Sequence, residues 1–199
     1  RASDLFELNW PAPAFLGGIL LFAIKMGKFP DKVSKIFTIH IIYSIFLVVL
    51  VTAQTFYPLL PLKGKSDITN RYHVFSSFPN ELRNYLTAAS KYKNHRIIAN
   101  NYQIPSMVNL YIKPELEATC LSIGYHETLY SFLYPDEKLI GGHYLYLTKG
   151  ENFPTNLNRY FDEILPLRQF KSMRKGKTIA KYSLWYVKNY RGKQVYTKF

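Results

Sequence analysis

The sequence predicts two transmembrane α-helices followed by an extracytoplasmic α/β domain with a mixed sheet in two or three layers. The first observation behind this prediction is that the stretch from Ile36 to Leu62 contains no formally charged side chain. Because about 20 apolar residues suffice to cross the hydrocarbon of a bilayer, this stretch predicts a membrane span. The second observation is that residues 63–199 alternate between strand-like and helix-like patterns, which is typical of an α/β layer. The membrane part is therefore predicted in residues 1–62 and the domain in residues 63–199.

The first predicted span covers about residues 10–27 and is built around PAFLGGILLFAI, from Pro13 to Ile24. Trp10 at its start is a residue type that anchors helices at the membrane interface, and Gly17–Gly18 would let another helix approach closely. The uninterrupted apolar core is short, so a buried helix of a soluble protein remains an alternative for this segment.

The second predicted span covers about residues 36–60. Its apolar residues lie on all sides of the helix rather than along one stripe, as burial in lipid or in a bundle requires. Pro58 and Pro61 end the span, and Tyr57 lies at interfacial depth. His40 is the one ionisable side chain inside it. Such groups are candidates for function, but a position near the end of the span also fits a purely structural role.

The topology of the two spans follows from the segment between them, KMGKFPDKVSK, which carries four lysines against one aspartate. A short lysine-rich loop is typical of the cytoplasmic side, so residues 63–199 are predicted on the opposite face. The whole chain has 26 Lys and Arg against 13 Asp and Glu, and most of this positive excess follows residue 62. An outer location is still compatible with that charge, because long domains translocate largely regardless of it.

The domain is predicted to contain helices and strands in alternation, ending in an antiparallel pair with Gly176 in the turn. The predicted helices are 76–92, 104–112 and 152–165, and the predicted strands are 95–101, 116–123, 141–149, 166–173 and 177–189. Many of the 17 tyrosines alternate along these strands, as in HYLYL and YSLWYV, which indicates sheet packing. Stacking on nucleic-acid bases is the less favoured alternative, since no nucleic-acid-binding motif accompanies the tyrosines.

Residues 1–199 contain none of the common catalytic or nucleotide-binding motifs. Gly-rich phosphate loops, HExxH and GxSxG are absent, and the five histidines are scattered without the spacing of metal ligands. The adjacent pairs Asp136–Glu137 and Asp162–Glu163 do not resemble an acid/base dyad and are interpreted as solvated charges. The single cysteine, Cys120, excludes an internal disulfide and is expected to be a buried, inert thiol.

Several segments resemble one family. LNWPAPAFLGGILL, from Leu8 to Leu21, resembles the segment that opens a late transmembrane helix in bacterial polyprenyl-phosphate-dependent glycosyltransferases of GT-C type. These enzymes include the aminoarabinose transferase of lipid A and the protein mannosyltransferases. DITNRYHVFSSFPNELRNYL, RIIANNYQIPSMVNLYI, GGHYLYLTKG and the last strand resemble the family's C-terminal domain in the same order. Two positions depart from the family's pattern: Ser77–Phe78 stands for a usual Gly-Trp, and Asn101 stands for a usual acidic residue.

The resemblance implies transfer of a sugar from a polyprenyl-phosphate donor to an envelope acceptor such as lipid A, a glycan or a protein. The enzyme would be a multi-pass protein of the bacterial inner membrane with a periplasmic C-terminal domain. The first residues, RASDLFELNW, lack a signal-peptide pattern, so we expect a C-terminal fragment of the longer protein. The catalytic carboxylate of this family lies in an upstream loop, together with any divalent metal. No catalytic residue is therefore assigned to this chain.

Six residues are candidates for contact with the donor. The resemblance implies that Arg71, Tyr72, Asn101 and Tyr102 line a cavity that the domain caps, and Lys63 and Lys65 lie near the membrane exit with Arg71. An anionic headgroup would suit these cations, because Arg can bind a phosphate bidentately and Lys acts as a point charge.

Two alternatives to this function stay open from the sequence. The cations near the membrane could contact ordinary anionic lipid. The whole chain could instead be a non-catalytic, membrane-anchored module that binds an envelope partner or anionic lipid. Nucleic acid is not an expected partner.

Overall fold

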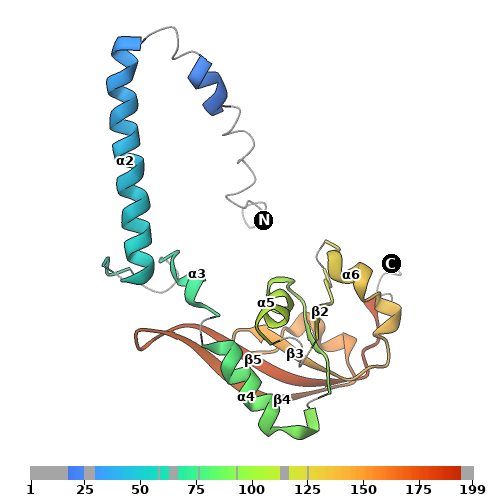
Figure 1. Ribbon diagram of the computed structural model, residues 1–199. Coiled ribbons are helices and arrows are strands. Elements are labelled where there is room, and N and C mark those ends of the chain that lie inside the picture. Colours follow the sequence, from blue (N-terminus) through green and yellow to red (C-terminus); the bar gives the residue numbers. More distant parts are fainter. Residues whose placement is uncertain are drawn as a thin grey trace. The chain divides into compact units, whose positions relative to one another are not determined.

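The computed structural model of the protein describes residues 18–24, 30–57, 59–62, 67–75, 77–92, 94–112, 117–124 and 126–193. The chain divides into two compact units, Arg1–Leu60 and Pro61–Phe199 (Figure 1). Each unit is described by itself.

The first unit is dominated by the helix α2 (Pro30–Phe56). Its stretch Phe37–Phe56 is the one helix among the described residues that is long and apolar enough to cross a membrane. Polar groups at its end are satisfied locally: the Thr55 hydroxyl donates to the Val51 carbonyl at 2.9 Å, and the Gln54 amide exchanges two hydrogen bonds with the backbone of Leu60. Such internal pairing is what a lipid environment requires of a helix.

The predicted spans agree with the structure only in part. Helix α2 begins at Pro30, inside the predicted lysine-rich loop, and ends at Phe56, before the predicted end at residue 60. Pro at the first helical position is preorganised for a helix start, which explains the earlier beginning. Residues 18–24 are also helical, and the rest of the predicted span 10–27 lies outside the described residues.

The second unit contains one five-stranded mixed sheet of order β2-β1-β3-β5-β4. The strands β1 (Ile97–Ala99), β2 (Ala118–Cys120) and β3 (Tyr144–Lys149) are parallel, whereas β5 (Lys177–Lys188) is antiparallel to both β3 and β4 (Glu163–Arg174). An α/β domain with a mixed sheet is therefore confirmed.

Successive side chains of a strand point to opposite faces of the sheet. Apolar side chains are buried on both faces, so a hydrophobic core lies on each. Along β3, Leu145 and Leu147 belong to one core, which the helices α4 (Phe78–Ala88) and α5 (Gln103–Ile112) cover. Tyr144 and Tyr146 belong to the other core, to which residues of the 3₁₀-helix η5 (Thr155–Tyr160) contribute. The tyrosines of β3 and β5 thus pack against the sheet, as the alternation indicated, and burial raises the pKa of the Tyr182 phenol.

Most predicted elements of the domain are confirmed, but the predicted helix 152–165 is wrong. Pro154 is followed by the short 3₁₀-helix η5, and Glu163 already begins β4. Asn side chains compete for backbone hydrogen bonds and weaken a helix, while Ile164 and Leu165 suit a strand. The helix α6 (Leu129–Leu133) and the 3₁₀-helices η3 (Ser90–Tyr92) and η4 (Asp136–Lys138) complete the domain.

The strands β4 and β5 form a long hairpin whose turn is Lys175–Gly176. Both residues have positive φ, 47° and 76°, as a two-residue turn matched to the strand twist requires. Gly176 in the turn is thereby confirmed. In the register of β3 and β5, Lys149 pairs with Tyr182 and Tyr144 with Val187. The hairpin turn therefore lies toward the same end of the sheet as the carboxyl ends of β1, β2 and β3.

Candidate functional site

Asp67, near the start of the domain, forms a tight polar turn. The Asp67 carboxylate accepts hydrogen bonds from the Thr69 backbone N–H at 3.0 Å and from the Thr69 hydroxyl at 2.6 Å. This local pairing leads directly into the short helix α3 (Asn70–His73). The turn is buried, since Asp67 is 5% exposed and Thr69 is 2% exposed.

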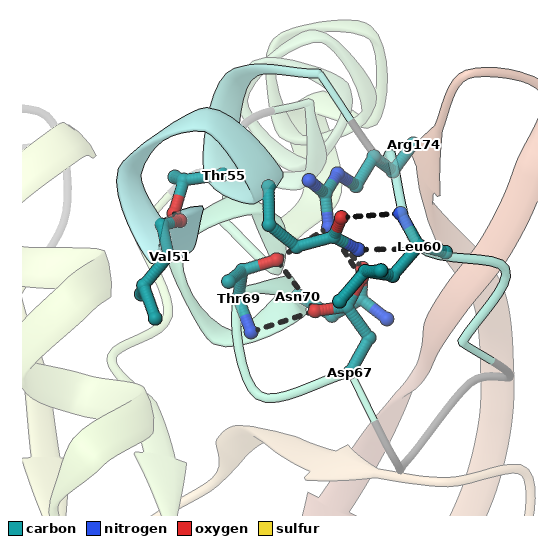
Figure 2. Close-up of polar contacts among 8 residues, drawn as sticks. Val51, Thr55, Leu60, Asp67, Thr69, Asn70 and Arg174 are labelled. Atoms are coloured by element: carbon teal, nitrogen blue, oxygen red, sulfur yellow. Dashed lines mark hydrogen bonds and ion pairs between the residues drawn. The ribbon is translucent and has the colours of Figure 1, made fainter. Parts of the chain in front are cut away.

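Arg174, the last residue of β4, reaches this turn from the tip of the hairpin (Figure 2). Its Nη1 donates to Asp67 Oδ2 at 3.2 Å, to Thr69 Oγ1 at 2.9 Å and to Asn70 Oδ1 at 2.7 Å. Asp67 and Arg174 form an ion pair with side chains only 5% and 7% exposed. We name the four residues Asp67, Thr69, Asn70 and Arg174 the clamp, because they join the domain's first turn to the hairpin.

A second contact reinforces this junction. The Ser172 hydroxyl is fully buried and lies within hydrogen-bonding distance of the backbone carbonyls of His73, at 3.2 Å, and Val74. Helix α3 thus packs on β4 through polar contacts at the tip end of the hairpin.

Three exposed cations flank the clamp residues along the chain. Arg71 on α3 and Lys175 and Lys177 at the hairpin turn are all exposed. The segments 67–75 and 171–180 contain one acidic residue, Asp67, which is already paired with Arg174. We name Arg71, Lys175 and Lys177 the basic surface. It can bind an anionic group such as a phosphate.

The predicted site residues fall into three groups. Arg71 and Tyr72 are exposed on α3, beside the clamp, whereas Lys63 and Lys65 lie outside the described residues. Asn101 and Tyr102 lie where β1 leads into α5, at the same end of the sheet as the clamp but on a different element.

Asn101 has a local role in this position. Its side-chain oxygen accepts a hydrogen bond from the backbone N–H of Gln103, the first residue of α5, at 2.8 Å. It therefore stabilises the start of the helix. The neighbouring Asn100, which was not predicted, pairs through both amide atoms with the backbone of Ile123, at 2.7 and 2.9 Å. This pairing ties the loop after β1 to the loop after β2.

Tyr102 borders a cavity of about 430 Å³ between α5 and α6. Its lining comes from two segments: Tyr102, Ser106, Asn109, Thr128, Leu129, Tyr130 and Leu133. We name this cavity the α5–α6 pocket. Tyr102 is also one of the predicted donor-site residues, but sequence reasoning did not predict this pocket and missed α6, whose five residues are too few for a periodic pattern.

The described residues contain no group of three or more His, Cys, Asp or Glu side chains that could hold a metal ion. Cys120 is buried, as expected for an inert thiol. Comparison of the chain with models of protein families, with curated proteins and with solved structures finds no significant match.

Proposed function

We propose that the chain is the C-terminal part of an integral membrane glycosyltransferase that transfers a sugar from a polyprenyl-phosphate donor to an envelope acceptor. Two transmembrane helices, of which α2 is the second, would anchor it in the bacterial inner membrane, with the α/β domain on the periplasmic side. The observation that carries this proposal is the clamp. It is built from Asp67, Thr69 and Asn70 of the DITNR segment that carries part of the family resemblance, and it holds a basic surface just after the membrane part.

The length of the connecting chain limits how far this surface can lie from the membrane. Asp67 follows Phe56, the last residue of α2, by eleven positions. A fully extended chain of that length spans at most about 40 Å. If α2 crosses the bilayer, Asp67 therefore lies within about 40 Å of the membrane end of that helix.

The chemistry of the basic surface suits a phosphate group. The Arg71 guanidinium can donate two parallel hydrogen bonds to phosphate oxygens, while Lys175 and Lys177 supply positive charge. These residues bind and orient the donor and do not carry out the chemical step. The catalytic carboxylate belongs to the part of the enzyme that precedes this chain, as would any metal.

The experiment that tests the proposal measures donor binding by the full-length protein. Replacing Arg71 with Ala should raise the Kd for the polyprenyl-phosphate donor about tenfold, the loss of one charge-assisted contact. Lys177→Ala should raise it by a smaller factor. Lys138→Ala is the matched control, because Lys138 is an equally accessible cation on η4. Unchanged donor affinity in Arg71→Ala would remove the basic surface from the donor site.

One alternative has support from the same observation. The basic surface would also attract ordinary anionic phospholipid, at about 1 kcal/mol for each cation near the membrane. The chain would then be a non-catalytic, membrane-anchored module. Binding to vesicles of anionic phospholipid and to vesicles doped with polyprenyl phosphate separates the two. Equal losses on both kinds of vesicle in Arg71→Ala favour the module, and a loss confined to polyprenyl phosphate favours the enzyme.

A further inference from the structure

The α5–α6 pocket has the wall chemistry of a hydrocarbon site. The described residues that line it include no charged side chain. Three of its polar side chains pair with one another: the hydroxyls of Ser106 and Tyr130 lie 3.0 Å apart, and the Asn109 amide donates to the Tyr130 hydroxyl at 3.4 Å. Because these groups already have partners, the pocket offers aromatic and aliphatic surface to a ligand. A sugar or a phosphate would lose its hydration there and form few hydrogen bonds in exchange, which is unfavourable.

The backbone of the edge strand holds this arrangement in place. The Asn109 amide also exchanges two hydrogen bonds with the backbone of Ala118, at 2.8 and 2.9 Å. Asn109 therefore connects α5 to the first residue of β2, and through Tyr130 to α6. The pocket is a built feature of the fold, and its volume falls within the range of about 300–1,000 Å³ typical of ligand sites.

The rim of the pocket is unusually apolar for a surface in contact with water. Two leucines of its lining lie on α6, Leu129, which is 71% exposed, and Leu133, which is 58% exposed. Exposed apolar side chains gathered at a pocket mark a site that meets lipid or another apolar partner. With Tyr102, which directly precedes α5, they form an exposed apolar edge of the pocket.

We propose that the α5–α6 pocket holds the hydrocarbon chain of a membrane lipid. The ten residues between Phe56 and Asp67 keep Asp67, near the start of the domain, within about 40 Å of the end of α2. The pocket adjoins the loops after β1 and β2, at the sheet end that also carries the clamp. A lipid is therefore the apolar molecule that the domain meets at highest concentration. This inference rests on the proposed function only in placing the domain at the bilayer.

The test is lipid photocrosslinking of the full chain in nanodiscs. The nanodiscs contain a phospholipid with a diazirine at the end of one acyl chain, and the crosslinked peptides are identified by mass spectrometry. The variant is Leu129→Asn, and the matched control is Leu110→Asn, because Leu110 is 69% exposed and lies on α5 outside the pocket lining. Both replacements affect exposed side chains, so neither should unfold the domain.

The expected result is crosslinking to the peptide that contains residues 128–133. It should fall about fivefold in Leu129→Asn, the effect of losing one leucine contact, and stay unchanged in Leu110→Asn. Crosslinks confined to α2, or equal yields from the two variants, would overturn the proposal.

Competition with soluble amphiphiles identifies the kind of chain. Displacement of the crosslink by farnesyl phosphate but not by dodecyl phosphate assigns the pocket to an isoprenoid chain, and equal displacement assigns it to ordinary acyl chains. Displacement by neither would also overturn the proposal. Failure of the Arg71→Ala donor test would leave these crosslinks intact, so the two proposals fail separately.

Discussion

Breaking the clamp should destabilise the domain far more than breaking an exposed ion pair. In Asp67→Ala, Arg174 would keep its hydrogen bonds to Thr69 and Asn70 but lose its counter-charge while it remains buried. The Thr69 backbone N–H and hydroxyl would also lose their acceptor. Removing one partner of a buried ion pair typically costs about 3–5 kcal/mol, and we expect the free energy of unfolding to fall by about 3 kcal/mol.

The double variant Asp67→Ala with Arg174→Met sharpens this prediction. It removes both charges together, so no unpaired charge remains buried, and it should cost less than the sum of the single variants by about 2 kcal/mol. The assay is urea unfolding of the full chain in detergent micelles, followed by the fluorescence of Trp185, which packs against Phe153 in the core.

The control for the clamp is Glu151→Ala, which breaks the ion pair of Glu151 with Lys181 on the same hairpin. These side chains are 51% and 46% exposed, so the loss should stay below about 1 kcal/mol. If Asp67→Ala costs no more than Glu151→Ala, or if the two clamp variants are additive, the clamp does not hold the hairpin and the reasoning fails.

Three further predictions concern single positions. Burial, aided by the charge of His143, lowers the pKa of His95, so the unfolded chain binds a proton more readily and stability should fall as the pH is lowered through 6.5. Gly142→Ala should cost about 1–3 kcal/mol, because a Cβ there would lie 2.2 Å from the Tyr144 hydroxyl oxygen. In a Cys120→Ala background, Asn152→Cys should react with a membrane-impermeant maleimide in intact cells, because Asn152 is exposed and the domain is proposed to lie outside.

Each of these predictions has a clear opposing result. Urea unfolding between about pH 5 and pH 8 should show a flatter profile for His95→Gln than for His126→Gln, an exposed position, and identical profiles would contradict the first prediction. Wild-type stability of Gly142→Ala would show that the Tyr144 ring moves aside at no cost. Protection of Asn152→Cys in intact cells, with labelling after lysis, would place the domain in the cytoplasm.

The sequence predicted a helix or strand of the domain correctly where the apolar pattern of a segment favours the same structure as its packing in the fold. The short strand at Ile97 and the hairpin around Gly176 were found because apolar runs there are bounded by turn residues. The segment 152–165 misled the prediction, because its mixture of apolar and polar residues fits a helix as well as a turn followed by a strand. Its partner strand β5, which pairs with β4 from Glu163 onward, decides the outcome.

The site was less accessible to sequence reasoning. Asp67 and Arg174 lie 107 residues apart in the sequence. Nothing in the sequence around either residue distinguishes it from an ordinary exposed charge. Asn101 was predicted to contact a ligand, yet its place just before a helix already fitted a capping role. Tyr102 was predicted to line the donor cavity that the domain caps, and that prediction stays a prediction; in the structure Tyr102 borders the apolar α5–α6 pocket.

The two candidate surfaces share one end of the sheet, and the strand directions explain why. Parallel strands place the loops after β1 and β2 at one edge, and the antiparallel pairing of β5 with β3 brings the hairpin turn to that same end. The clamp fastens this turn to the residues that follow α2 in the chain. The clamp, the basic surface and the α5–α6 pocket therefore share one end of the domain.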